Sequence, residues 1–330
     1  MRSRVLIVLG ALILTLLMPV AVGARSANGA ARAEHDRILA YWTPARIAAA
    51  QPRDYIRDDK GHLVPYAKPG GGSSGTGASW IGGGAVVNRV GKILYHAGNS
   101  NWVCSGTVVT DASTSNHYSV VLSAGHCAYD QADGWSTNWM FIPDFDDAPT
   151  FTCSATVYGC WTATRLAINS DFYPSGFGPD AALRVDYSFA LVGLGGKPGE
   201  AKELDAVVGG YGLKTSGTSN ADTQWAFGYP AAGKYHGNDL IYCTGTTTPD
   251  PYGVDTWGMA CNMTGGSSGG GWLYGSSNPG TDAGKLLSSV NSYGYSGLTK
   301  MFGPKFDSET PVVMGDVIDG SATGGVTVLH

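Results

Sequence analysis

Two short segments of this chain carry the residue types that acyl transfer requires. In the first, Thr264–Gly271, Ser268 stands among glycines whose backbone amides can turn toward one point in front of its hydroxyl. Attack by a hydroxyl on a carbonyl creates an oxyanion, and backbone N–H groups stabilise that charge. The second segment, Leu122–Cys127, contains His126, a side chain suited to be the general base. The two segments together predict a serine hydrolase.

The glycines around Ser268 also satisfy the G-x-S-x-G pattern of the nucleophile elbow in α/β-hydrolases. That fold places its acid and its histidine after the serine, whereas the only histidine after Ser268 is His330, the last residue of the chain. It also requires alternating strands and helices, which the sequence does not show. We therefore discard the α/β-hydrolase interpretation.

The elements that must position these groups are predicted to be short strands. Charged residues make up only 14% of the chain and glycine occurs 49 times, a composition typical of a turn-rich β protein. From Ile81 onward, β-prone runs alternate with turn residues, as in a barrel or sandwich. These runs cover residues 84–87, 92–96, 105–109, 119–123, 155–158, 189–192, 206–208, 224–227, 240–243 and 286–290.

The N-terminus predicts export from the cell. Arg2 and Arg4 precede an apolar stretch over residues 5–17, and Val22-Gly23-Ala24 offers a small-residue cleavage site. The alternative, a membrane anchor, is disfavoured because the apolar stretch is short for a span. We predict a signal peptide over residues 1–24 and a secreted, extracellular protein.

A propeptide and linker are predicted over residues 25–77, followed by the catalytic domain over residues 78–330. Residues 41–50 resemble a short helix with Thr43 as its N-cap and Pro44 at its first position. The glycine-rich stretch over residues 69–77 is typical of a flexible linker. An extension that stays attached explains residues 25–77 equally well.

Six cysteines fit an oxidising environment, although sequence alone leaves 15 connectivities open. The spacing favours the nearest pairs, Cys104 with Cys127, Cys153 with Cys160 and Cys243 with Cys261. A zinc site is the alternative, but the chain lacks CxxC and HxxxH pairs, so no metal and no cofactor is expected. The net charge of −5 gives no reason to expect nucleic acid as a partner.

Three segments taken together resemble the trypsin/chymotrypsin-like serine peptidases. They are Cys104–Val109, Leu122–Cys127 and Gly266–Gly270, and the nearest branch is the secreted bacterial glutamyl-endopeptidase type. The resemblance covers roughly residues 80–305. It implies an all-β fold of two antiparallel six-stranded barrels, over about residues 80–195 and 200–305, with the active site in the cleft between them.

The same resemblance implies a role for each reactive residue. His126 is the general base, Ser268 the nucleophile, and Asp186, which precedes an apolar strand, holds the imidazole in place. Asp180 is a rival for the acid, but its following residues match the family less well. The backbone N–H groups of Gly266 and Ser268 are expected to form the oxyanion hole.

Substrate binding is expected along Ser292-Tyr293-Gly294, where the family adds the substrate backbone as an antiparallel strand. Asn262 corresponds to the floor of the specificity pocket, and together with Thr264 and Asn291 it offers hydrogen-bond donors for a substrate carboxylate. These neutral donors hold a carboxylate less tightly than charged groups do. A preference for glutamate therefore stays a hypothesis.

One position departs from the digestive members of the family. Ser267 replaces the aspartate that pairs with a freed N-terminus, so propeptide removal is predicted to act by unblocking the cleft. The expected partners are protein or peptide substrates, and the expected form is a monomer. Two alternatives are a catalytically silent binding protein and an esterase on the same scaffold.

Overall fold

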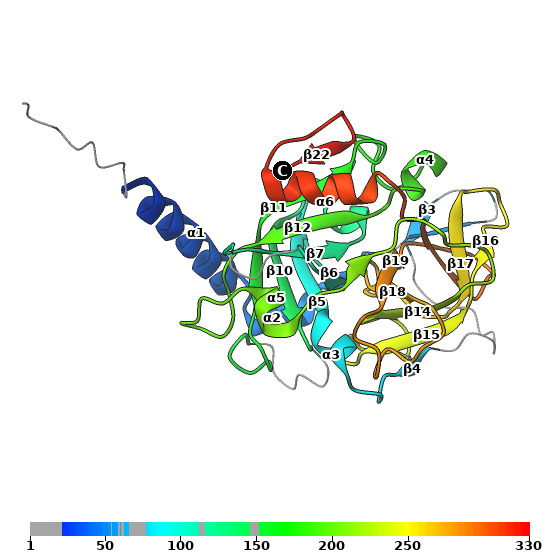
Figure 1. Ribbon diagram of the computed structural model, residues 1–330, viewed down its shortest axis with the longest axis horizontal. Coiled ribbons are helices and arrows are strands. Elements are labelled where there is room, and N and C mark those ends of the chain that lie inside the picture. Colours follow the sequence, from blue (N-terminus) through cyan, green and yellow to red (C-terminus); the bar gives the residue numbers. More distant parts are fainter. Residues whose placement is uncertain are drawn as a thin grey trace, which may run out of the picture.

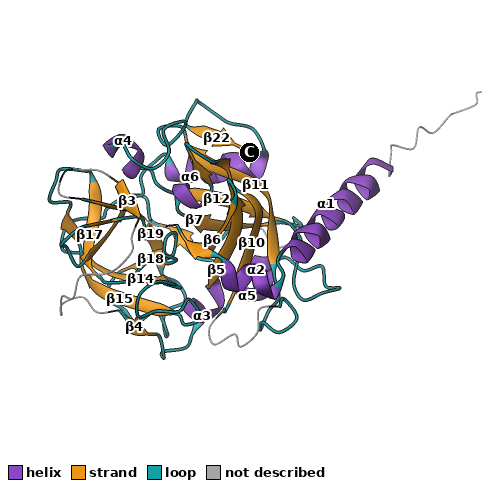
Figure 2. Cartoon of the chain, turned by 180° about the vertical axis from the view of Figure 1, so that it is seen from behind, coloured by secondary structure: helices purple, strands orange, loops and turns teal. Residues whose placement is uncertain are grey.

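A computed structural model describes residues 22–53, 55–58, 60, 63–65, 77–111, 116–145 and 152–330. It shows two β units side by side, with a long N-terminal helix that projects away from the first (Figures 1 and 2). Residues 1–21 of the predicted signal peptide and 66–76 of the predicted propeptide and linker lie outside the described residues.

The first unit is a closed barrel of six antiparallel strands. Hydrogen-bonded pairing follows the ring β6-β5-β10-β11-β12-β7 and returns from β7 to β6. Strands β7 and β12 are buried over their whole length, so they appear in the sequence as continuous runs rather than alternating ones. The six strands are β5 (Val90–Ala97), β6 (Ser100–Val109), β7 (Ser119–Ser123), β10 (Thr137–Pro143), β11 (Trp161–Asn169) and β12 (Ser188–Val192).

The second unit is built on six strands divided between two sheets. One sheet contains the order β19-β18-β14-β15 and the other pairs β17 with β21. The sheets meet where β15 contacts β17 and where β19 contacts β21, and Cys243–Cys261 joins β15 to the residue after β17. The strands are β14 (Thr223–Gly228), β15 (Ile241–Thr246), β17 (Thr256–Ala260), β18 (Gly271–Tyr274), β19 (Leu286–Val290) and β21 (Lys300–Pro304). The all-β, two-barrel expectation is confirmed.

Three of the predicted strands are wrong. Residues 84–87 enter helix α3 (Ala85–Arg89), and residues 206–208 end helix α5 (Leu204–Val208), where Leu204 and Val208 are buried one helical turn apart. Residues 155–158 form turns inside the loop that Cys153–Cys160 closes, which is too short for a strand and its return. In all three, a short apolar run was ambiguous between strand and helix or turn.

The remaining short elements connect the barrels or cap their ends. A 3₁₀ turn over Gly125–Cys127 carries His126 out of β7. The others are helix α4 (Asp180–Leu183) and strands β4 (Ala78–Ser79), β8 (Tyr129–Asp130), β9 (Gly134–Trp135), β13 (Gly212–Leu213) and β16 (Thr248–Pro249).

The N-terminal region folds onto both barrels. Helix α1 (Val22–Tyr41), which was not predicted, contacts β10 and β11, and the expected short helix is α2 (Pro44–Ala49), capped by the Thr43 hydroxyl. Strand β1 (Gln51–Pro52) then pairs with β6 of the first barrel. Strand β2 (Tyr55–Arg57) pairs with β20 (Gly294–Tyr295) beside the second barrel and with β3 (Leu63–Pro65).

The C-terminal region returns to the first barrel, which the predicted limit near residue 305 did not foresee. Helix α6 (Thr310–Asp319) contacts β11 and β12, and β22 (Thr327–Leu329) pairs with β11 (Figure 1). Among the described residues, no helix combines the length and the apolar character that crossing a bilayer requires.

Candidate active site

His126 and Asp186 form a buried pair in the first barrel. His126 Nδ1 lies 2.8 Å from Asp186 Oδ2, and the backbone N–H of His126 donates to Oδ1 at 2.8 Å. An ionised carboxylate can only accept, so the ring proton sits on Nδ1 and Nε2 is left as the basic nitrogen. Ser292 Oγ donates to Asp186 Oδ2 at 2.5 Å from the second barrel. The carboxylate therefore fixes both the tautomer and the orientation of the imidazole.

Asp180, the rival acid, lies elsewhere. It starts helix α4, and its side chain is 62% exposed and pairs with Arg57 at 2.6 Å. Asp186, by contrast, is fully buried just before β12. Only Asp186 of these two aspartates contacts His126 in the structure.

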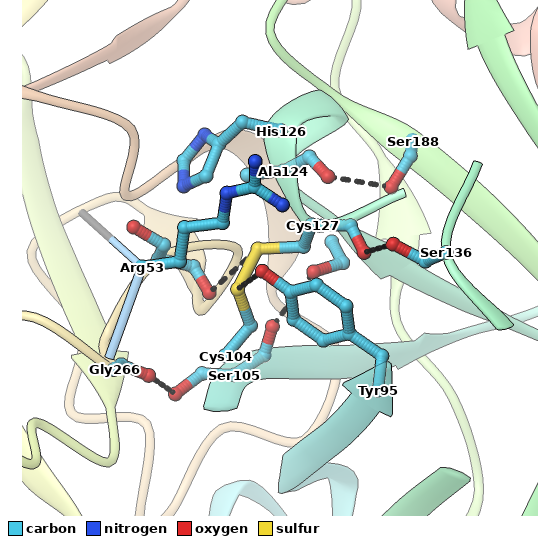
Figure 3. The surroundings of a disulfide bond; sticks show 12 residues. Arg53, Tyr95, Cys104, Ser105, Ala124, His126, Cys127, Ser136, Ser188 and Gly266 are labelled. Atoms are coloured by element: carbon cyan, nitrogen blue, oxygen red, sulfur yellow. Dashed lines mark hydrogen bonds between the residues drawn. A yellow bond between two sulfur atoms is a disulfide. The ribbon is translucent and has the colours of Figure 1, made fainter. Parts of the chain in front are cut away.

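The loop that carries Ser268 is held against the first barrel next to His126. Ser105 N donates to the Ser268 carbonyl at 2.7 Å, and Ser105 Oγ donates to the Gly266 carbonyl at 2.8 Å. The Ser268 carbonyl also lies 3.9 Å from Cys127 Sγ, in the disulfide that joins Cys104 to Cys127. Figure 3 shows His126, Ser105 and Gly266 among the residues around that disulfide. Ser105 was part of a recognised motif, but sequence reasoning gave it no role.

Two glycines in this loop are required by its geometry. Gly266 has φ of +99°, a conformation that side-chain-bearing residues avoid, and this turn directs the backbone just before Ser268. Gly269 has φ of +83°, and a Cβ there would lie 2.1 Å from Ser123 Oγ. The glycine therefore allows the loop to approach the strand that leads into His126.

The predicted substrate edge lines a pocket beside Ser268. The walls come from the second barrel and from β2, and the space that remains measures only about 20 Å³ for the centre of a water molecule. That is room for roughly one water. The lining residues are Tyr55, Ile56, Met263, Ser268, Ser292, Tyr293, Gly294, Lys300 and Met301.

The other three residues expected to bind substrate have side chains that bond to protein groups. Asn262 Oδ1 accepts from Gly77 N at 2.7 Å and from Tyr235 OH at 2.9 Å. Thr264 Oγ1 donates to the Ala232 carbonyl at 2.8 Å.

Asn291 is more fully engaged still. It is completely buried, donates to the Phe227 and Ser267 carbonyls, and accepts from Trp272 Nε1 at 2.7 Å. The structure thus brings Ser292, Tyr293 and Gly294 to the pocket lining but not Asn262, Thr264 or Asn291.

The reactive groups are covered by residues that the sequence did not single out. Exposed fractions are 1% for His126 and 2% for Ser268. The Phe177 ring packs edge-on against His126 with centroids 5.1 Å apart, and Tyr55 stacks on Phe177 at 5.4 Å. Arg53, which is 5% exposed, also lies beside the Cys104–Cys127 disulfide (Figure 3). No local pattern marks these contacts, because they join residues far apart in the chain.

All six cysteines are paired, in the three nearest-neighbour disulfides that the spacing favours. Cys104 and Cys127 Sγ lie near His126, but both sulfurs are committed to the disulfide. A cysteine binds a metal ion as a free thiolate, so this cluster does not fit a metal ion.

Comparisons with known proteins identify the family to which this fold belongs. No family model and no curated protein matches the chain. Among solved structures, it is similar to the protease Anisep from Arthrobacter nicotinovorans, with 34% identity and a TM-score of 0.57 over 72% of this chain and 97% of that one. It is similar to the thermostable serine protease AL20 from an extremophilic microorganism, with 31% identity and a TM-score of 0.57 over 73% and 100%.

A Glu endopeptidase shares the fold, with 20% identity and a TM-score of 0.53 over 74% of this chain and 96% of that one. The first two similarities each span nearly the whole of the related protease at more than 30% identity. This chain belongs to the chymotrypsin-like serine proteases and is a hydrolase of the serine endopeptidase class.

Proposed function

We propose that this protein is a secreted serine endopeptidase that cleaves peptide bonds through His126, Asp186 and Ser268. The observation that carries the proposal is the buried His126–Asp186 pair, held next to the loop that presents Ser268. The proposed substrates are proteins or peptides that bind as an extended strand. The part of the substrate before the cut adds antiparallel to Ser292-Tyr293-Gly294.

In the first half of the reaction, His126 Nε2 takes the proton from Ser268 Oγ as that oxygen attacks the peptide carbonyl. The backbone N–H groups of Gly266 and Ser268 stabilise the oxyanion, and one such donor lowers the activation barrier by about 3 kcal/mol. Asp186 stabilises the imidazolium that forms. His126 then gives its proton to the leaving amine, so the carbonyl carbon stays on Ser268 as an acyl-enzyme.

In the second half, a water molecule takes the place of the amine. His126 removes a proton from this water as its oxygen attacks the acyl carbonyl, and the same N–H groups again hold the oxyanion. Collapse of this intermediate breaks the bond to Ser268 Oγ, which recovers its proton from His126. The product is a carboxylic acid, and no cofactor takes part.

Export and processing complete the proposal. A signal peptide over residues 1–24 directs secretion, and the three disulfides suit an oxidising compartment. A propeptide over residues 25–77 makes the newly synthesised chain a zymogen. The peptidase unit over residues 78–330 acts as a monomer.

The test is a cleavage-site profile. The processed protein and its Ser268→Ala variant are each incubated with a complex peptide mixture, and new termini are read by mass spectrometry. We expect cuts from the wild type only, because removal of the nucleophile lowers turnover by about six orders of magnitude. The residue before each cut reports the preference of the pocket.

The alternatives give different outcomes. A folded, processed protein that makes no cuts and is not labelled by a fluorophosphonate is a binding protein on a peptidase scaffold. Ester turnover without peptide cleavage identifies an esterase. Equal cutting by the Ser268→Ala variant would refute the role of Ser268.

A further inference from the structure

We infer that the cleft of this protein is a binding site for its own residues 51–53 and 55–57, which lie across it as a strand of reversed polarity and inhibit the enzyme. The inference rests on the proposed function, because it takes the Ser268 cleft to be the substrate site. The occupant of that site is part of the chain itself, and its reversed direction explains why it is not cut. A free peptide of this sequence is accordingly an inhibitor of the processed enzyme.

Backbone pairing places the segment on both sides of the reactive groups. On one side, Gln51 and Pro52 pair with Trp102 and Val103, directly before Cys104. On the other side, Ile56 pairs with Gly294, part of the proposed substrate edge. The Arg57 carbonyl accepts from Ser296 N at 2.9 Å. The chain therefore spans the cleft from the Cys104–Cys127 disulfide to the substrate edge.

The direction of the segment is opposite to that of a substrate. A substrate places its acyl part antiparallel to Ser292-Tyr293-Gly294, whereas β2 is parallel to β20. Residues 51 and 52 pair in parallel with β6, so the N-terminal end of the segment lies on that side of the cleft. Both pairings therefore give the segment the same direction. In a reversed strand the nitrogen that would leave lies on the wrong side of each carbonyl to receive a proton from His126. The segment can occupy the cleft without meeting the geometry for cleavage.

Side chains at both ends anchor the segment. The Arg53 guanidinium is buried and lies 3.0 Å from Asp130 Oδ1 and 2.6 Å from Asp133 Oδ2, with Trp102 beneath it at 5.0 Å. At the other end, Arg57 Nη1 lies 2.6 Å from Asp180. Charge-assisted bonds from a buried arginine are costly to break, since the acidic partners are left unpaired.

The centre of the segment covers the reactive groups. Tyr55 stacks on Phe177, which packs against His126, and Tyr55 and Ile56 both line the pocket beside Ser268. With the segment in place, His126 and Ser268 are almost fully buried and the pocket holds about one water. A peptide side chain cannot enter such a space, so substrate and segment exclude each other.

The first test measures how fast a fluorophosphonate labels Ser268 in the full-length chain. The wild type is compared with a double variant, Arg53→Ala with Tyr55→Ala, and with Arg37→Ala as the control. Arg37 pairs with Glu34 on the exposed side of α1, so its loss leaves the cleft covered. We expect the double variant to be labelled at least about tenfold faster than the other two. Equal labelling of all three full-length chains would overturn the inference.

The second test uses a synthetic peptide of residues 51–57 on the processed enzyme. We expect competitive inhibition and full recovery of the intact peptide, whereas a peptide with the same residues in the opposite order does not inhibit. Cleavage of the 51–57 peptide would overturn the reversed polarity.

A third measurement does not depend on catalysis. In the full-length Ser268→Ala chain, the Ser296 amide should exchange with solvent about tenfold faster once Arg53 and Tyr55 are removed, because Arg57 O no longer protects it. Unchanged exchange overturns the inference whatever the labelling shows. If exchange changes but no form of the protein that contains Ser268 is labelled, the proposed function fails, while the inference that residues 51–53 and 55–57 occupy the cleft is retained.

Discussion

The two barrels hold their parts of the site in different ways. The first barrel is a ring closed by hydrogen bonds from β6 round to β7, and α6 and β22 pack on its outside. In the second barrel the described strands form two sheets, and a disulfide links β15 to the end of β17. One barrel is thus closed by its backbone and the other by side-chain contacts and a covalent link.

This difference matches what each barrel contributes to the site. His126 follows β7 and Asp186 lies just before β12 of the closed ring, so the position of the imidazole is set by a rigid scaffold. Ser268 lies on a loop, and Asn291 ties that loop to β14 and β18 through three buried hydrogen bonds. A ring closed by backbone hydrogen bonds is suited to fixing one geometry, and two sheets joined through side chains can adjust around a substrate strand.

Among changes in the first barrel, loss of the Asp186 carboxylate should have the strongest effect. Asp186→Asn should lower kcat by about four orders of magnitude, because the amide can no longer hold the productive imidazole tautomer. The measurement is turnover of a peptide chosen from the cleavage profile, with the processed enzyme. Asp180→Asn is the matched control, and its kcat should stay within about twofold. A similar loss of kcat in both variants would show that Asp186 is not the aspartate that supports His126.

The next effect concerns how the second barrel is closed. Replacing Cys243 and Cys261 together by alanine should lower the free energy of unfolding by about 3 kcal/mol, the value expected for a loop of 18 residues. Urea unfolding of the Ser268→Ala protein measures it without self-cleavage.

Hydrogen exchange tests the same difference between the two barrels. Amides of β15 and β17 should exchange faster in the Cys243→Ala, Cys261→Ala protein, while those of β7 and β12 keep their protection. The matched control replaces Cys153 and Cys160, whose loop lies outside the ring strands. Loss of protection in both barrels would show that they unfold as one unit.

A smaller effect depends on a lysine that joins the barrels. Lys92 in β5 is buried, its Nζ donates to the Gly237 carbonyl at 2.9 Å, and burial lowers its pKa to about 8 from 10.5. Between these two values the unfolded chain binds a proton that the folded chain does not, so this contribution to stability rises with pH and is lost as pH falls through 8. In the Ser268→Ala protein, the free energy of unfolding should gain about 2 kcal/mol from pH 7.5 to 9.5 relative to Lys92→Met. An identical pH dependence in both proteins would contradict it.

The sequence predicted the parts of this molecule whose signals are local. Ser268 among glycines and His126 beside Cys127 are recognisable within a few residues, and Asp186 precedes an apolar run that is β12. Helices α3 and α5 were mistaken for strands because short apolar runs do not distinguish the two. The contacts of Arg53 and Tyr55 could not be foreseen, since their partners Asp133 and Phe177 are distant in the chain and no periodicity connects them.

A weaker effect should follow from loss of the hydrogen bond that links Ser292 of the second barrel to Asp186 of the first. Ser292 Oγ donates to Asp186 Oδ2, while both carboxylate oxygens also bond to His126. Ser292→Ala should lower kcat about tenfold, because the carboxylate loses one of the three hydrogen bonds that hold it in place beside the imidazole.

With that bond removed, the carboxylate interacts more strongly with the imidazolium. The acid limb of the pH profile of kcat/KM should therefore move to higher pH, a change that a purely structural role would not produce. Ser289→Ala is the control, because Ser289 is equally buried and its Oγ donates to a carbonyl of its own strand. If both variants lower kcat equally and leave the acid limb in place, the two barrels are coupled by packing and not by this bond.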